Sequence, residues 1–146
     1  MPKALVVYAT RTQKTKEIAN HIAEGIKAAG SEVTVLDVKS IRCPSELEGY
    51  DGYAFGSATY HGEMMEAMKT ILFMAEKANL DGKIGGAFGS YGWSGEAPDR
   101  IYQTMQNIFN MKMVNTALRI KSPAPLGDAQ LAQAYGREIG QKIKVT

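Results

Sequence analysis

Hydroxyl side chains, glycines and aromatic residues gather at three points of this sequence, each directly after an apolar run. Residues 10–15 read Thr-Arg-Thr-Gln-Lys-Thr and follow the apolar run 4–8. Residues 56–62 read Gly-Ser-Ala-Thr-Tyr-His-Gly and follow 53–55, and residues 89–96 read Gly-Ser-Tyr-Gly-Trp-Ser-Gly-Glu and follow 84–88. In parallel α/β sheets, ligands bind at the carboxyl ends of the strands, where such loops begin. We therefore take the three segments as parts of one ligand site.

The first segment has the chemistry of a phosphate site. Hydroxyls and free backbone N–H groups at a helix N-terminus bind phosphate without needing a cationic side chain. Ordinary helix capping is the alternative, but it requires only one of the three threonines. The predicted phosphate-binding residues are Thr10, Arg11, Thr12, Gln13, Lys14 and Thr15.

The other two segments each combine glycines with aromatic residues, which suits a flat aromatic ligand held on both faces. Tyr60 and Trp93 are the candidates for the two faces, with Tyr91 the next choice and core packing the alternative role. The predicted ring-binding residues are Ser57, Ala58, Thr59, Tyr60, His61, Gly62, Gly89, Ser90, Tyr91, Gly92, Trp93, Gly95 and Glu96. One phosphate loop and two ring loops together describe a site for flavin mononucleotide (FMN).

The elements that position these loops alternate along the chain. We predict strands at 3–9, 32–38, 52–57, 83–90 and 114–121, and helices at 14–29, 63–79, 97–110 and 128–144. Several strands are continuous apolar runs, as in a parallel sheet that is buried on both faces. Repeated right-handed crossovers then build an α/β doubly wound five-stranded parallel sheet, one domain over 1–146. The crossover 39–50 contains Pro44 and is expected to be mostly irregular.

Nearly the whole chain resembles the flavodoxin family. Thr10, Thr12 and Thr15 stand at the hydroxyl positions of a first loop similar to (Ser/Thr)-x-Thr-Gly-x-Thr, with Gln13 where the family usually has glycine. The second and third loops are most similar to the flavodoxin modules of flavo-diiron proteins. The resemblance implies the flavodoxin-like strand order 2-1-3-4-5 and FMN as cofactor. We expect Gln13 to reach the required backbone shape within the ordinary allowed regions.

The expected function is that of an FMN-dependent, low-potential electron carrier, shuttling electrons between redox enzymes rather than acting as an enzyme itself. No acid–base dyad or activated nucleophile is evident. Two alternatives stay open: an NAD(P)H- or quinone-reacting flavoprotein oxidoreductase on the same fold, and a cofactor-free binding module. Glu63, Glu66, Glu96 and Asp99 follow the ring loops, and we expect them to open two helices and to form an acidic rim that steers a basic partner.

The composition bears on the class of protein and on the kinds of site that we expect. The chain has 146 residues, of which 45% are apolar and 22% charged, as in a single globular domain. No run approaches the ~20 apolar residues of a membrane span, and no leader pattern precedes the first strand. Cys43 is the only cysteine and the histidines are two, so we expect a cytoplasmic protein without a metal site. No basic run predicts nucleic-acid binding, and the oligomeric state stays open.

Overall fold

A parallel sheet forms the centre of the molecule. The structure is a computed structural model, and it describes residues 2–10, 13–60, 63–91, 96–121 and 127–144. The strands of the sheet are β1 (Lys3–Ala9), β2 (Glu32–Asp37), β3 (Gly52–Ser57), β6 (Ile84–Tyr91), β7 (Lys112–Met113) and β8 (Leu118–Lys121). They lie in the order β2-β1-β3-β6-β7, with β8 also paired to β6, and all these pairs are parallel. The predicted order 2-1-3-4-5 is confirmed, with β7 and β8 sharing the fifth place.

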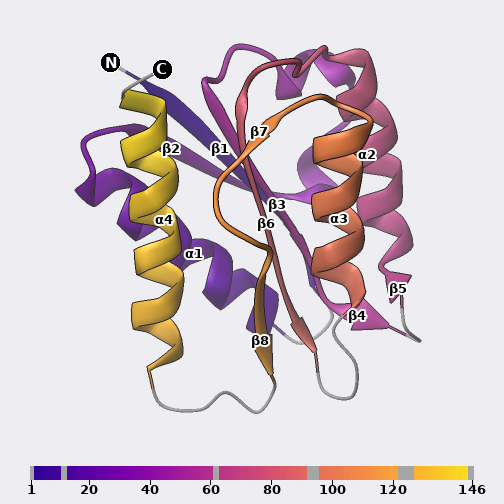
Figure 1. Cartoon of the computed structure of the whole chain (residues 1–146). Coiled ribbons are helices and arrows are strands. Elements are labelled where there is room, and N and C mark those ends of the chain that lie inside the picture. Colours follow the sequence, from indigo (N-terminus) through magenta and orange to yellow (C-terminus); the bar gives the residue numbers. More distant parts are fainter. Residues whose placement is uncertain (1, 11–12, 61–62, 92–95, 122–126, 145–146) are drawn as a thin grey trace.

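Helices cover both faces of this sheet (Figure 1). In the described ranges they are α1 (Lys14–Ala28), α2 (Glu66–Lys77), α3 (Glu96–Asn107) and α4 (Asp128–Lys144). Helices α1 and α4 pack together on one face, while α2 and α3 cover the other. Gly30 follows α1 with φ of 98°, the left-handed conformation expected of a glycine that ends a helix. Within the described residues, none of the helices has the length and apolar character to cross a membrane.

Alternate residues of the strands supply two cores. Leu5 and Val7 of β1 pack with Met68 of α2 on one face. Val6, between them, packs with Ile22 of α1 on the other face. Strand side chains alternate between faces, so a strand that is covered twice must be apolar throughout. Each large buried side chain contributes about 1.5–3 kcal/mol, which holds the helices against the sheet and fixes the ends of the strands.

The fifth strand differs from its prediction. We expected one strand over 114–121, but β7 ends at Met113 and β8 begins at Leu118. Asn115 lies in the interruption with φ of 50°, and its carbonyl accepts a hydrogen bond from the Tyr102 hydroxyl at 2.7 Å. A left-handed residue cannot continue a strand. The strand is therefore interrupted at residues 114–117 before the chain pairs with β6 again as β8.

The helix after β3 also starts later than predicted. We expected a helix from residue 63, but Glu63 and Met64 form the short strand β5 (Glu63–Met64), antiparallel to β4 (Thr59–Tyr60). Helix α2 then begins at Glu66. Glu63 is therefore not a helix-opening residue, and the second loop is a small hairpin. The crossover 39–50 holds two short 3-10 turns, η1 (Val38–Ser40) and η2 (Pro44–Leu47), with irregular chain around them.

Candidate functional site

The first predicted loop joins β1 to α1 at the carboxyl edge of the sheet. Thr10 comes directly after β1, and its hydroxyl oxygen is buried without a hydrogen-bond partner among the described residues. Gln13 has φ of 72° and ψ of −11°, so it is left-handed, and its own side chain does not cap the helix. Our expectation that Gln13 would stay in the ordinary allowed regions was wrong. The geometry that starts α1 requires a left-handed residue at this position, whatever its side chain.

Thr15 connects this loop to the end of β6. Its side chain is completely buried in the first turn of α1, and its hydroxyl lies 2.8 Å from the hydroxyl of Ser90. Ser90 is itself only 5% exposed. The first and third predicted loops are therefore joined by one buried hydrogen bond. Buried hydroxyls without partners are costly, so this pair fixes how α1 sits against β6.

Lys14 places a positive charge at the same helix start. Its ammonium lies 3.7 Å from the carboxylate of Asp128, the first residue of α4, and 3.8 Å from that of Glu17. The Lys14 and Asp128 side chains are 18% and 11% exposed, so their pair is largely shielded from water. The sequence analysis missed Asp128. A glycine followed by an acidic residue is common at the start of a helix. Asp128 is therefore recognised as part of the site from its position beside Lys14 in the structure.

Hydroxyl groups of the second loop form hydrogen bonds within the loop and with residues at the starts of α2 and α3. Ser57 is fully buried; its hydroxyl donates to the Ala58 carbonyl at 2.9 Å and accepts from the Met65 N–H at 3.0 Å. The Thr59 hydroxyl accepts from the Ala97 N–H at 3.1 Å and so caps the first turn of α3. The second loop is thus tied to both α2 and α3.

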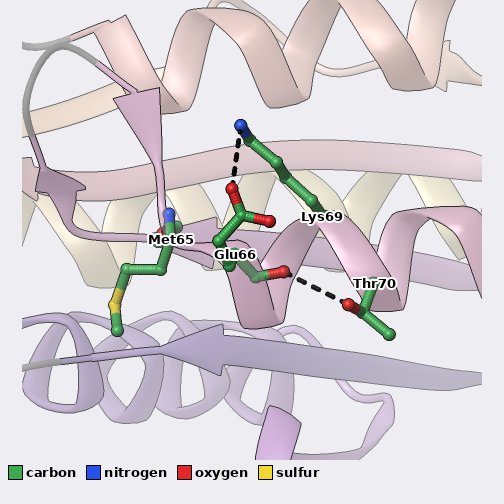
Figure 2. A network of polar contacts seen from close by, with 5 residues as sticks. Met65, Glu66, Lys69 and Thr70 are labelled. Atoms are coloured by element: carbon green, nitrogen blue, oxygen red, sulfur yellow. Dashed lines mark hydrogen bonds and ion pairs between the residues drawn. The ribbon is translucent and has the colours of Figure 1, made fainter.

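The start of α2 holds its own polar network, which Figure 2 shows from close by. Glu66 and Lys69 form an ion pair at 3.4 Å, and the Thr70 hydroxyl donates to the Glu66 carbonyl at 3.3 Å. Asp99 at the start of α3 likewise pairs with Arg119 at 3.4 Å. Glu66 and Asp99 of the expected acidic rim are therefore paired with cations. Paired, exposed charges steer a partner less strongly than free ones.

The third loop begins where β3 and β6 come unusually close. A Cβ on Gly89 would lie 2.1 Å from the Ser57 carbonyl oxygen and 2.9 Å from the Pro98 ring. Only glycine fits there, which brings the starts of the second and third loops together. Tyr91 ends β6 and is partly buried. Glu96 is the first residue of α3.

Part of the predicted set lies outside the described residues: Arg11, Thr12, His61, Gly62, Gly92, Trp93 and Gly95. The structure describes the backbone of Tyr60 but not its side chain. The predicted contacts of Tyr60 and Trp93 with a ring therefore stay predictions. Thr10, Gln13, Lys14, Thr15, Ser57 and Ser90 are brought to one edge of the sheet.

The donors at this edge fit an anionic group. Thr10 and Thr15 lie at the positive end of the α1 dipole, and one of them has a buried hydroxyl without a partner among the described residues. Phosphate oxygens accept from such donors. Among the described residues no cluster of histidine, cysteine and carboxylate side chains could hold a metal ion.

Comparison with known proteins gives the family. The sequence model described as flavodoxin matches residues 6–135. This chain belongs to the flavodoxin family. A flavodoxin from the domain Archaea has a similar structure, with a TM-score of 0.91 and 35% identity over 97% of this chain and 99% of that one.

Larger proteins contain a similar domain. A putative diflavin flavoprotein A 2 of Thermosynechococcus vestitus is 33% identical over 97% of this chain, which covers 25% of that protein. The flavodiiron protein of Giardia intestinalis has a TM-score of 0.91 at 21% identity, over 98% of this chain and 36% of that one. The latter supports the fold alone. The chain thus spans about a quarter of the length of the first curated relative that it matches.

Proposed function

We propose that this flavodoxin-family chain binds FMN and carries electrons between larger redox proteins. The observation that supports it best is the set of hydroxyls at the start of α1. The buried Thr10 hydroxyl lacks a partner within the described ranges, and Thr15 is buried in the same turn. A phosphate would satisfy these donors, and the helix dipole would favour its charge.

The chain would contribute binding and shielding. The phosphate would be held by the hydroxyls of Thr10, Thr12 and Thr15 and by backbone N–H groups of residues 11–15, with Lys14 supplying a positive charge. The ring would lie at the edge where Gly89 lets the second and third loops meet, between the predicted aromatics Tyr60 and Trp93. When bound, FMN supplies the electron-transfer chemistry. Titrations of the apoprotein with FMN and with riboflavin test this proposal.

We expect tight FMN binding and much weaker riboflavin binding, because riboflavin lacks the phosphate. Equal affinities would contradict the phosphate assignment, and no binding of either would favour the cofactor-free module. A carrier should also oxidise NAD(P)H negligibly unless a reductase is added. Rapid NAD(P)H oxidation by the purified chain alone would favour the oxidoreductase alternative.

A further inference from the structure

The hydrogen bond between the Thr15 and Ser90 hydroxyls leaves one of their two protons without a described acceptor. Each hydroxyl has one proton, and the single 2.8 Å hydrogen bond between them uses one of the two. Both side chains are almost fully buried, so water does not accept the second proton. In the part of the chain that the structure describes, neither hydroxyl has another hydrogen-bond acceptor. A buried donor without an acceptor is unfavourable, so the pair is arranged to donate to a group outside the described residues.

The positions of the two residues indicate which one holds the spare proton. Thr15 is the second residue of α1, where the helix dipole and free N–H groups favour an anion. Ser90 lies in β6, one residue before its end, and its hydroxyl is hydrogen-bonded to Thr15 of α1. A donor aimed at a phosphate is therefore expected at Thr15. Ser90 then has to donate to Thr15.

We propose that Ser90 is a positioning residue for phosphate binding, acting through Thr15 in a hydroxyl relay. In this relay the Ser90 hydroxyl donates to Thr15 Oγ1, and the Thr15 hydroxyl donates to a phosphate oxygen. The hydrogen bond from Ser90 fixes the rotation of the Thr15 hydroxyl and polarises its O–H bond. Chained hydrogen bonds strengthen one another in this way. No proton is transferred. The inference rests on the proposed FMN binding, and it gives a residue of the third loop a role at the phosphate end.

The test measures FMN and riboflavin affinities of the full-length apoprotein and its variants by quenching of flavin fluorescence. We expect Ser90→Ala to weaken FMN by about three- to tenfold, the range of a neutral hydrogen bond, with riboflavin changed less than about twofold. Thr15→Val should weaken FMN by about tenfold or more, because the hydrogen bond to the charged phosphate is lost. Thr15→Ser keeps the hydroxyl and should bind FMN nearly as well as the wild type.

The relay makes a specific prediction for the double variant. Because Ser90 acts only through Thr15, adding Ser90→Ala to Thr15→Val should not weaken FMN further, whereas adding it to Thr15→Ser should. Ser31→Ala is the matched control, since Ser31 is a buried serine at the opposite end of α1. It should leave FMN affinity unchanged. If Ser90→Ala does not fold, as judged by circular dichroism, Ser90→Cys keeps the volume with a weaker donor and should give an intermediate loss.

Inorganic phosphate gives a readout without flavin. It should raise the melting temperature of the wild-type apoprotein more than that of Ser90→Ala. Several outcomes would overturn the relay: equal losses for FMN and riboflavin, unchanged FMN affinity in Ser90→Ala, or additive losses in the Thr15→Val double variant. If the wild type binds FMN and riboflavin equally, the proposed phosphate site fails first. The two failures are therefore distinguishable.

Discussion

The ammonium of Lys14 lies 3.7 Å from the carboxylate of Asp128, which joins the first turn of α1 to the first turn of α4. Both helices cover the same face of the sheet, and their starts lie at one end of the molecule (Figure 1). A Cβ on Gly136 of α4 would lie 2.0 Å from the Ile22 carbonyl oxygen of α1, so the two helices touch through their backbones. The ion pair therefore joins two helices that are in close backbone contact.

This pair should affect both stability and phosphate binding. Lys14→Met leaves the Asp128 carboxylate shielded from water without its cation, beside the proposed phosphate. We expect the apoprotein to lose about 1–3 kcal/mol, less than a fully buried pair because both groups keep some exposure. FMN affinity should fall while riboflavin affinity holds, and titrations at two salt concentrations would measure this.

Asp128→Asn is the matched variant, because it removes the negative charge while Lys14 remains. FMN should then bind as tightly as in the wild type or more tightly, since Lys14 is no longer neutralised by Asp128. If Asp128→Asn instead weakened FMN as much as Lys14→Met does, the carboxylate would be needed to position Lys14.

The Tyr135 hydroxyl accepts a hydrogen bond from a backbone N–H of β6 where the fifth strand is interrupted. Gly85 of β6 still accepts from the Val114 N–H at 2.9 Å, but two residues later the Ala87 N–H donates to the Tyr135 hydroxyl at 3.0 Å. Tyr135→Phe leaves this buried N–H unsatisfied, which should cost about 1–3 kcal/mol. Tyr102→Phe is the control, because it loses the exposed bond to the Asn115 carbonyl and should cost about 0.5–1.5 kcal/mol. Urea denaturation measures both; equal losses would contradict the role of Tyr135.

The same tyrosine predicts a pH dependence. Burial raises the pKa of Tyr135 above its ordinary value, so the folded protein keeps a proton that the unfolded chain releases above about pH 10. Its contribution to stability is complete below that pH and is lost as the pH rises further. The free energy of unfolding should therefore fall more steeply in the wild type than in Tyr135→Phe, by at most about 1.4 kcal/mol per pH unit. Parallel pH profiles would contradict it.

The sequence predicts this fold well where a pattern repeats. Continuous apolar strands and the stripe of Ile18, Ile22 and Ile26 specify the layers, and α1 and α4 begin at their predicted residues. Two-residue strands have no period to read, so the hairpin of β4 and β5 was missed. The split of the fifth strand was missed as well, because it depends on the contact of Asn115 with Tyr102.

The candidate site was predictable as a location more than as a set of contacts. Three loops at the ends of neighbouring strands must meet at one edge, whatever their side chains do. Which hydroxyl serves the ligand and which serves the fold depends on distant partners. Thr59 caps α3 through Ala97, and Thr15 is bonded to Ser90, 75 residues away. Spacing within a loop contains no information about either partner.

The two predicted aromatic contacts give a test of the ring site. Trp93→Ala and Tyr60→Ala should each weaken FMN and make its reduction easier, because a stacked ring excludes water and disfavours the electron-rich reduced flavin. Tyr50→Ala is a control for loss of an aromatic ring, since Tyr50 lies before β3, at the opposite edge of the sheet. Redox titration and FMN affinity measure the effect. Wild-type affinity and potentials in both ring-loop variants would make Trp93 and Tyr60 packing residues.

The left-handed backbone of Gln13 leads to the last prediction. With φ of 72°, Gln13 places its carbonyl to accept the Glu17 N–H at 3.0 Å, which starts α1. A side chain in this conformation costs about 1–2 kcal/mol. Glycine avoids the cost but loses roughly 0.5–1 kcal/mol through the greater freedom of its unfolded chain. Gln13→Gly should therefore stabilise the apoprotein by about 0.5–1 kcal/mol.

Gln13→Ala separates strain from side-chain contacts. Alanine keeps the Cβ and so keeps the strain, and because the Gln13 side chain is exposed its loss should matter little. We expect Gln13→Ala to denature at nearly the wild-type urea concentration and Gln13→Gly at a higher one. FMN affinity should change less than about twofold in both, because the backbone shape is the same in all three proteins. If Gln13→Gly were no more stable than Gln13→Ala, the left-handed backbone would not be a source of strain. If Gln13→Gly bound FMN much more tightly than the wild type, the wild-type apoprotein would relieve part of the Gln13 strain, and phosphate binding would restore it.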